Sequence, residues 1–235
     1  MAATSDPRIT KHALVEVTPY ITLVGVVHDH PASCHRVRSV IADRQPSTLA
    51  LELPPLAVPL FERYANPTDA MPDWGGEMSA AIEAYDGSTI LGIDGPSQGF
   101  LSHGIESWRA GTLTTSDMLG FLRRVSGAMT TAIHARTAAS LPSPLARRCR
   151  VGTPLDYAVD DTDDPRVQAR DERNHVARAR AVMDAMDPAA GVDHRDRIRE
   201  DWMAAQLSSV SASESVVAVV GMGHLDALAE RLDPV

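Results

Sequence analysis

The sequence predicts an α/β fold with a mixed, mostly parallel central sheet flanked by helices. Short runs of aliphatic and β-branched residues recur along the chain, and segments with helical spacing separate them. The runs do not alternate with polar residues, which is typical of strands covered on both faces. Strand, helix and strand follow in short order, which favours parallel crossovers. We expect one domain over residues 1–235, with its core at about 18–233.

The first half of the chain contains three predicted strands, each preceded or followed by a helix. Ser33 is a favourable N-cap residue for the first of these helices. Pro54 and Pro55 stop the second strand. The predicted strands are 20–27, 47–53 and 88–94, and the predicted helices are 33–43 and about 77–85.

The second half is mainly helical and closes with one strand. A helix is expected at 117–140, with Leu119, Leu122, Val125 and Met129 on its apolar face. Pro165 marks the start of another helix, because proline at the first helical position lacks only an N–H that has no partner there. The further predicted elements are a helix at 193–207, a strand at 215–220 and a short helix after "GMGH".

Composition narrows the class of protein. The net charge is −9, from 22 basic and 31 acidic residues, and this disfavours nucleic acids and anionic membranes as partners. The acidic surplus is compatible with a halophilic source. Cys34 and Cys149 have no metal-type spacing and indicate free thiols in a reducing compartment. With no apolar run of about 20 residues and a polar N-terminus, we expect a soluble, cytoplasmic protein.

Ionisable residues stand at the ends of four predicted strands. His28 ends the first strand, Glu52 lies near the end of the second, Asp94 ends the third, and His224 follows the last. Open parallel sheets bind ligands at the carboxyl ends of their strands. Together, the four positions therefore indicate a functional site at one edge of the sheet.

Glu172 is an acid within the apolar stripe of the helix that starts at Pro165. A buried carboxylate is costly unless it is paired, metal-bound or protonated. Glu172 is thus a candidate site residue; the alternatives are a structural ion pair with an arginine, or a side chain that bends out to water. His30 is a further candidate, because alternate residues of a strand face the same side.

Four short motifs, in this order, resemble those of the TraB/PrgY/Tiki family. The chain departs from the family pattern at His30, where the family often has Ser, and at Asp94–Gly95, where it has Asp-Arg. Ala227 replaces a glycine, and an arginine that usually follows the Glu-Leu pair is missing. The matched motifs are "GVVHDHPASCHRVRSVI" (Gly25, His28, Ser33), "LALELP" (Glu52), "DERNHVARA" (Glu172, Arg173) and "VVAVVGMGHLDAL" (Gly221, Gly223, His224).

The resemblance implies the fold shared with erythromycin-esterase-like and ChaN-like proteins, and metal-dependent hydrolysis of a peptide or amide bond. His28, His224 and Glu52 would hold a divalent Zn, Mn, Co or Fe ion that lowers the pKa of a bound water. Glu172 would be the general base. We expect the two histidines and two glutamates to meet in one pocket, with Asp94 bonded to a histidine or a loop amide.

Two other functions fit the same residues. The chain could bind or sequester a peptide or small molecule without cleaving it, and the missing arginines favour this slightly. It could also be a metal-free, esterase-like hydrolase in which His28 is the base and Glu52 orients it.

Overall fold

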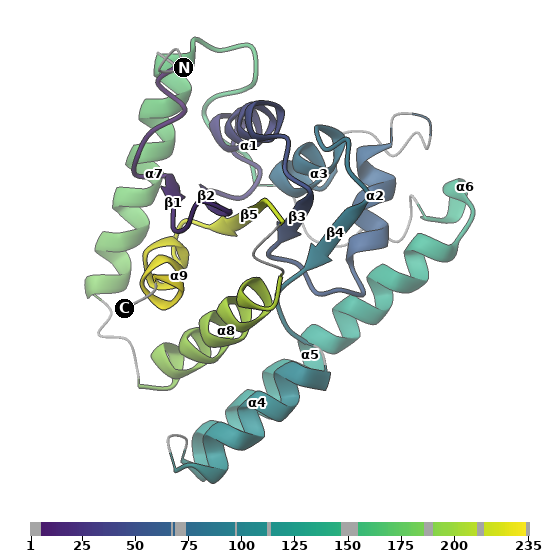
Figure 1. The fold of residues 1–235 in the computed structure, drawn as a ribbon, viewed down its shortest axis with the longest axis vertical. Helices are drawn as coiled ribbons and strands as arrows, with labels where there is room; N and C mark the ends of the chain where they lie inside the picture. The colour runs from purple at the N-terminus through teal and green to yellow at the C-terminus, as the bar shows by residue number, and fades with distance from the viewer. Residues whose placement is uncertain are drawn as a thin grey trace.

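The centre of the structure is a five-stranded sheet with the order β1-β2-β5-β3-β4 (Figure 1). β1 (Leu14–Glu16) runs antiparallel to β2 (Ile21–Val26). All the other pairs are parallel and involve β3 (Thr48–Leu51), β4 (Thr89–Gly92) and β5 (Val216–Gly221). The predicted class, a mixed and mostly parallel sheet flanked by helices, is confirmed. This computed structural model describes residues 6–66, 68, 74–96, 98–111, 114–146, 155–185, 190–210 and 214–233.

The register aligns the carboxyl ends of the parallel strands at one edge of the sheet. In the register, Val26 lies beside Gly221, and Leu51 lies between Val219 and Gly92. β5 is therefore central, with the ends of β2 and β3 on its two sides. Residues that follow these strands share one edge, as the candidate site requires.

Three helices cover one face of the sheet: α1 (Pro31–Arg44), α2 (Val58–Ala65) and α3 (Gly76–Glu83). Their apolar side chains pack with those of β2, β3 and β5 in one buried cluster that includes Val37 and Leu51. This burial is the main reason why short strands of four to six residues stay in place.

The opposite face is covered by α8 (Ala190–Ser208) and α9 (Leu225–Leu232). Met203 and Leu207 of α8 and Leu228 of α9 are fully buried against the other faces of the strands. The sheet is thus buried on both sides, in agreement with the unbroken apolar runs in the sequence.

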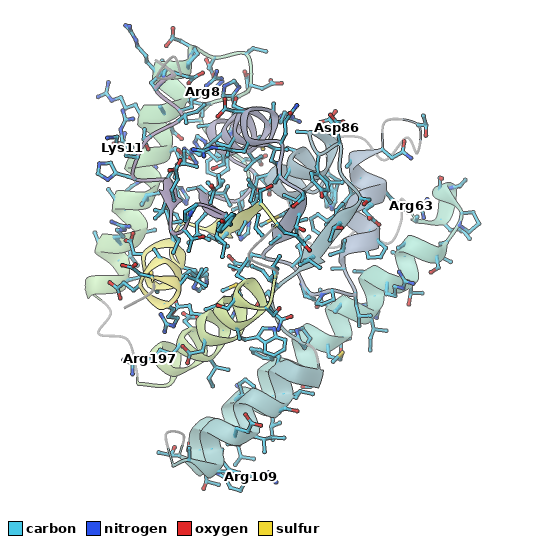
Figure 2. All side chains as sticks on the ribbon, in the orientation of Figure 1. Arg8, Lys11, Arg63, Asp86, Arg109 and Arg197 are labelled. Atoms are coloured by element: carbon cyan, nitrogen blue, oxygen red, sulfur yellow. The ribbon has the colours of Figure 1, made fainter. Side chains whose placement is uncertain are left out.

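Further helices surround this core: α4 (Gln98–Arg109), α5 (Thr115–Ser140), α6 (Ser143–Ala146) and α7 (Pro165–Ala185). α5 runs along the outside of α2 and α8, while α7 lies beside α1 (Figure 1). Arg63 of α2, labelled in Figure 2, joins α2 to α5. It donates to two carbonyls in the last turn of α5, at 3.2 and 3.1 Å.

Helices that are both long and apolar enough to span a bilayer do not occur in the described parts of the chain.

The apolar face of α5 differs from the predicted stripe. Leu119 and Leu122 are 66% and 42% exposed, whereas Met118 and Phe121 are buried together with Val125. The prediction was wrong because this helix is rich in alanine, so more than one of its faces has apolar residues at helical spacing. Phe121 is positioned by Phe100, with ring centroids 5.4 Å apart.

The elements that the sequence did not predict are β1, α2, α4 and α6. The first three predicted strands are shorter than expected, and the last has the expected length. α1 begins earlier than predicted, because the side chain of His30, not Ser33, caps it by accepting from Ala32 N at 3.1 Å. Only the first half of the α7 stripe is buried; Met183 is 59% exposed.

Phe121→Ala should lower the free energy of unfolding by about 3–5 kcal/mol, because it removes a buried aromatic side chain and leaves a cavity. Leu119→Ala on the same helix should change it by less than about 0.5 kcal/mol. Urea denaturation of both variants measures the difference. Equal losses in the two variants would contradict the observed phase of α5.

Candidate functional site

The turn after β2 separates the two histidines that the sequence placed on one strand. β2 ends at Val26, and Asp29 has φ of +56°, a left-handed conformation that Asp adopts more readily than most residues. Strand alternation therefore does not hold for His28 and His30. His28 is on the surface, with 64% of its side chain exposed, while His30 is fully buried.

Glu77, in the first turn of α3, holds His28 in place. Its Oε1 lies 2.7 Å from His28 Nδ1, and its Oε2 accepts from Asp29 N at 2.8 Å. Glu77 is 2% exposed, so both of its oxygens are used inside the protein. Within the described residues His28 Nε2 makes no hydrogen bond, and the ring is open to solvent.

The hydrogen bond that His28 Nδ1–H donates to Glu77 raises the pKa of His28 to about 9, against the opposing effect of burial. The negative charges of Glu77 and Glu52 add to the increase. His28 is therefore an imidazolium at neutral pH and a neutral base only under alkaline conditions.

Arg199 of α8 joins three residues that follow three different strands. Its Nη2 donates to Glu52 Oε1 at 2.6 Å and to Asp94 Oδ2 at 2.8 Å, and its Nη1 lies 3.1 Å from His224 Nε2. Burial disfavours the charged guanidinium, but the bond to Asp94 and the charges of Asp94 and Glu52 outweigh it and raise the pKa of Arg199. The cluster is thus centred on a permanent cation.

The side-chain oxygens of Glu52 and the ring nitrogens of His224 all have hydrogen-bond partners within the protein. Glu52 Oε2 accepts from Gly221 N at 2.6 Å, and its Oε1 takes the bond from Arg199. His224 Nδ1 lies 3.0 Å from Glu200 Oε1. Burial lowers the pKa of His224, but Glu200 and Glu52 more than compensate, and the net change is upward.

The backbone positions at Gly25 and Gly221 allow this packing. A Cβ on Gly221 would lie 3.3 Å from Glu52 Oε2, and one on Gly25 would lie 2.8 Å from Leu225 Cδ2. Nothing lies within 4 Å of such an atom on Gly223. The first two glycines therefore serve close approach between strands, carboxylate and α9.

Glu172 lies in a buried ion pair with Arg36 of α1. Arg36 Nη2 contacts Glu172 Oε2, and Nη1 donates to Glu172 Oε1 at 3.1 Å. Ser33 Oγ donates to the same Oε1 at 2.5 Å and accepts from Val27 N at 2.8 Å. Arg36 Nη1 also donates to Gly25 O at 2.8 Å. This is the structural ion pair that the sequence left open as an alternative.

His30 is likewise enclosed by protein. Its Nδ1 accepts from Ala32 N, and its Nε2 lies 3.4 Å from Asp171 Oδ2. The ring packs edge-on against Tyr157, with centroids 4.7 Å apart, and burial lowers its pKa. Both nitrogens have partners, so His30 anchors the start of α1 and does not face a ligand.

The predicted residues thus fall into three sets of contacts, of which the pair of His28 with Glu77 is the first. Glu52, Asp94 and His224 contact Arg199. The negative charge of Glu52 also raises the pKa of His28. Glu172 and Ser33 belong to the Arg36 ion pair, and Arg173 is exposed. Asp94 accepts from the loop amide of Gly95 at 2.8 Å, as expected, but its charged partner is Arg199.

Sequence reasoning missed the partners Glu77, Arg199, Glu200 and Arg36. Arg36 follows Ser33 by three residues on the buried face of α1, and this spacing was a usable signal. Glu77 follows a Gly-Gly pair at the start of a helix, where a carboxylate is favourable. Arg199 and Glu200 give no comparable signal, because they lie within a charged helix.

The chain matches no family model, no curated protein and no solved structure in three comparisons. The resemblance to the TraB/PrgY/Tiki family therefore stays a prediction from its motifs.

The arrangement does not fit the expected metal centre. The described residues contain no group of three or more His, Cys, Asp or Glu side chains placed to hold a metal ion. Glu52 and His224 instead face the Arg199 guanidinium, and His224 has both ring nitrogens occupied. A cation in contact with both would repel a divalent ion from them.

Glu77→Gln should shift the pKa of His28 from about 9 towards its usual value of 6.5, because the largest cause of the increase is removed. NMR titration of the histidine Cε1 protons measures this, with the His28 signal assigned by its loss in His28→Gln. Glu83→Gln, on the same helix but in an exposed pair with Arg38, is the matched control. A wild-type pKa near 6.5 would refute the assignment.

Glu172→Gln should lower the free energy of unfolding by about 3–5 kcal/mol, because Arg36 would keep its buried charge without a counter-ion. Arg173→Gln, one position along and exposed, should leave stability within about 0.5 kcal/mol. Thermal melts of the two variants provide the comparison. An unchanged melting temperature in Glu172→Gln would show that the ion pair with Arg36 does not stabilise the fold.

Proposed function

We propose that this chain is a hydrolase of amide or ester bonds, peptide bonds included, that works without a resident metal and uses His28 to transfer protons. The observation that carries the proposal is the His28–Glu77 pair. A solvent-open imidazole is held at 2.7 Å by a buried carboxylate, beside the carboxyl edge of a parallel sheet.

The chemistry follows from the two ring nitrogens. Glu77 fixes Nδ1–H and stabilises the imidazolium, which leaves Nε2 to accept a proton from water as the water oxygen attacks the carbonyl carbon. The same Nε2–H then protonates the leaving amine or alkoxide as its bond to carbon breaks. Glu77 takes the orienting role that the sequence had assigned to Glu52.

The high pKa of His28 sets the pH dependence of such a reaction. With a pKa of about 9, only about 1% of His28 is neutral at pH 7. The rate should rise close to tenfold per pH unit through the neutral range and level off near pH 9.

The Arg199 cluster supports the site without taking part in proton transfer. It holds Glu52, Asp94 and His224 at fixed positions after β3, β4 and β5, and supplies a positive charge at the sheet edge. Glu52, with both oxygens bonded, acts on His28 through its charge alone.

The test is turnover of p-nitrophenyl acetate, alanine p-nitroanilide and a quenched-fluorescence peptide library by protein dialysed against EDTA. His28→Gln should lower kcat/KM by about 100-fold or more, as expected when a proton-transfer group is lost. In Glu77→Gln the rising limb of the pH profile, which reports the pKa of His28, should move towards pH 6.5. His12→Gln, at an exposed position, is the control and should leave the rate unchanged.

Two results would replace this proposal. Activity that disappears in EDTA and returns with Zn or Mn would establish the metal-dependent hydrolase. Absence of turnover across all three substrate types up to pH 9.5 would leave the non-catalytic binding protein.

A further inference from the structure

A cavity of about 850 Å³ lies on the α1 side of the 28–30 turn, and His28 does not line it. Its walls are α1, the end of α2, one side of α3 and the acidic segment 155–161. The volume is in the range of small-molecule sites. The polar and aromatic groups that line it include Arg8, Asp29, His35, Arg38, Trp74, Glu83, Asp156, Tyr157, Asp160 and Asp161.

The basic groups of the cavity are already engaged. Arg8, labelled in Figure 2 beside α1, pairs with Asp6 at 2.7 Å, and Arg38 pairs with Glu83 at 3.0 Å. Burial and the Arg8 charge lower the pKa of His35, so this ring is neutral at pH 7. Neither arginine is left to attract an anion.

Four carboxylates of the cavity have no cationic partner within 4 Å in the described part of the chain: Asp29, Asp156, Asp160 and Asp161. Asp29 Oδ2 accepts from the amide of Leu155 at 3.1 Å, which fixes the acidic segment against the turn. Burial and the Glu77 charge raise the pKa of Asp29, and the bond from Leu155 and the His28 charge only partly oppose this increase. The cavity therefore carries uncompensated negative charge.

Aromatic rings add a second feature that favours cations. Trp74 and Tyr157 are partly buried and line the same cavity. Tyr157 is fixed by its hydroxyl, which donates to His28 O at 2.5 Å, and by edge contacts with His30 and His175. Aromatic faces next to carboxylates are the combination that binds organic ammonium groups.

We propose that this cavity is a binding site for a small organic amine, with its ammonium group towards Asp29, Asp156 and Asp161 and its apolar body against Trp74 and Tyr157. The cavity adjoins the turn that carries His28, because Asp29 belongs to that turn and Tyr157 contacts it, but His28 does not line it, and the proposal does not depend on hydrolase activity. A compensating cation also lowers the cost of the half-buried Asp29 carboxylate.

The experiment compares three probes that share a phenol ring and differ in charge: tyramine, 4-ethylphenol and 3-(4-hydroxyphenyl)propionate. Isothermal titration calorimetry and NMR shifts of the Trp74 indole N–H measure binding to the full chain. Tyramine should bind tightest and the carboxylate weakest, and binding of tyramine should weaken as salt is added.

A double variant tests the carboxylates. Asp156→Asn with Asp161→Asn should weaken tyramine binding by about fivefold or more, since two exposed charges are lost. The matched control is Asp86→Asn with Asp233→Asn, which removes the same charge at exposed positions outside the cavity (Asp86 is labelled in Figure 2). Its affinity should equal that of the wild type.

All four carboxylates are exposed, so both double variants should keep the melting temperature of the wild type. Thermal melts check that they are folded. The proposal is overturned if 4-ethylphenol binds as tightly as tyramine, or if tyramine does not bind at millimolar concentration. Equal affinity of the two double variants would also overturn it.

Discussion

The buried ion pair between Arg36 and Glu172 fixes the geometry on which the candidate site depends. It joins α1 to α7, and through Gly25 O and Ser33 it also holds the end of β2. A charged pair so fully enclosed requires each partner to be satisfied, and here both are. The turn that carries His28 therefore starts from a fixed point. Ser33 and Glu172, which were candidate site residues from the sequence, are both bonded within this framework.

A second arginine, Arg199, fixes residues that follow three strands, whereas Arg36 fixes the end of one strand. Three loops after β3, β4 and β5 bring acidic or imidazole groups to one guanidinium. Arginine is suited to this position because its planar fork binds carboxylates in two directions and stays charged when buried. Two arginines of the family pattern are missing from the sequence. Arg199 supplies a positive charge to the same edge from α8, a distant part of the chain.

The fold and the individual site residues were accessible from the sequence to different degrees. Apolar runs located four of the five strands, and the Asp-Pro signal located the start of α7, because both depend on local properties. The partners were not accessible, since His28 and Glu77 are 49 positions apart and Glu52 and Arg199 are 147 apart. His30 was misplaced for a local reason, because the positive φ of Asp29 ends strand alternation and is not encoded in a pattern of apolar residues.

The position of β5 between β2 and β3 has a consequence for how the protein is made on the ribosome. Both neighbours of β5 are synthesised long before it, so the middle of the sheet stays open until Val216–Gly221 has left the exit tunnel. Until then the nascent chain exposes two apolar strand edges, which are templates for pairing with other chains. Binding of chaperones to the nascent chain would matter most in that interval. His224 follows shortly after β5, so a chain that ends before β5 lacks both the central strand of the sheet and one member of the Arg199 cluster.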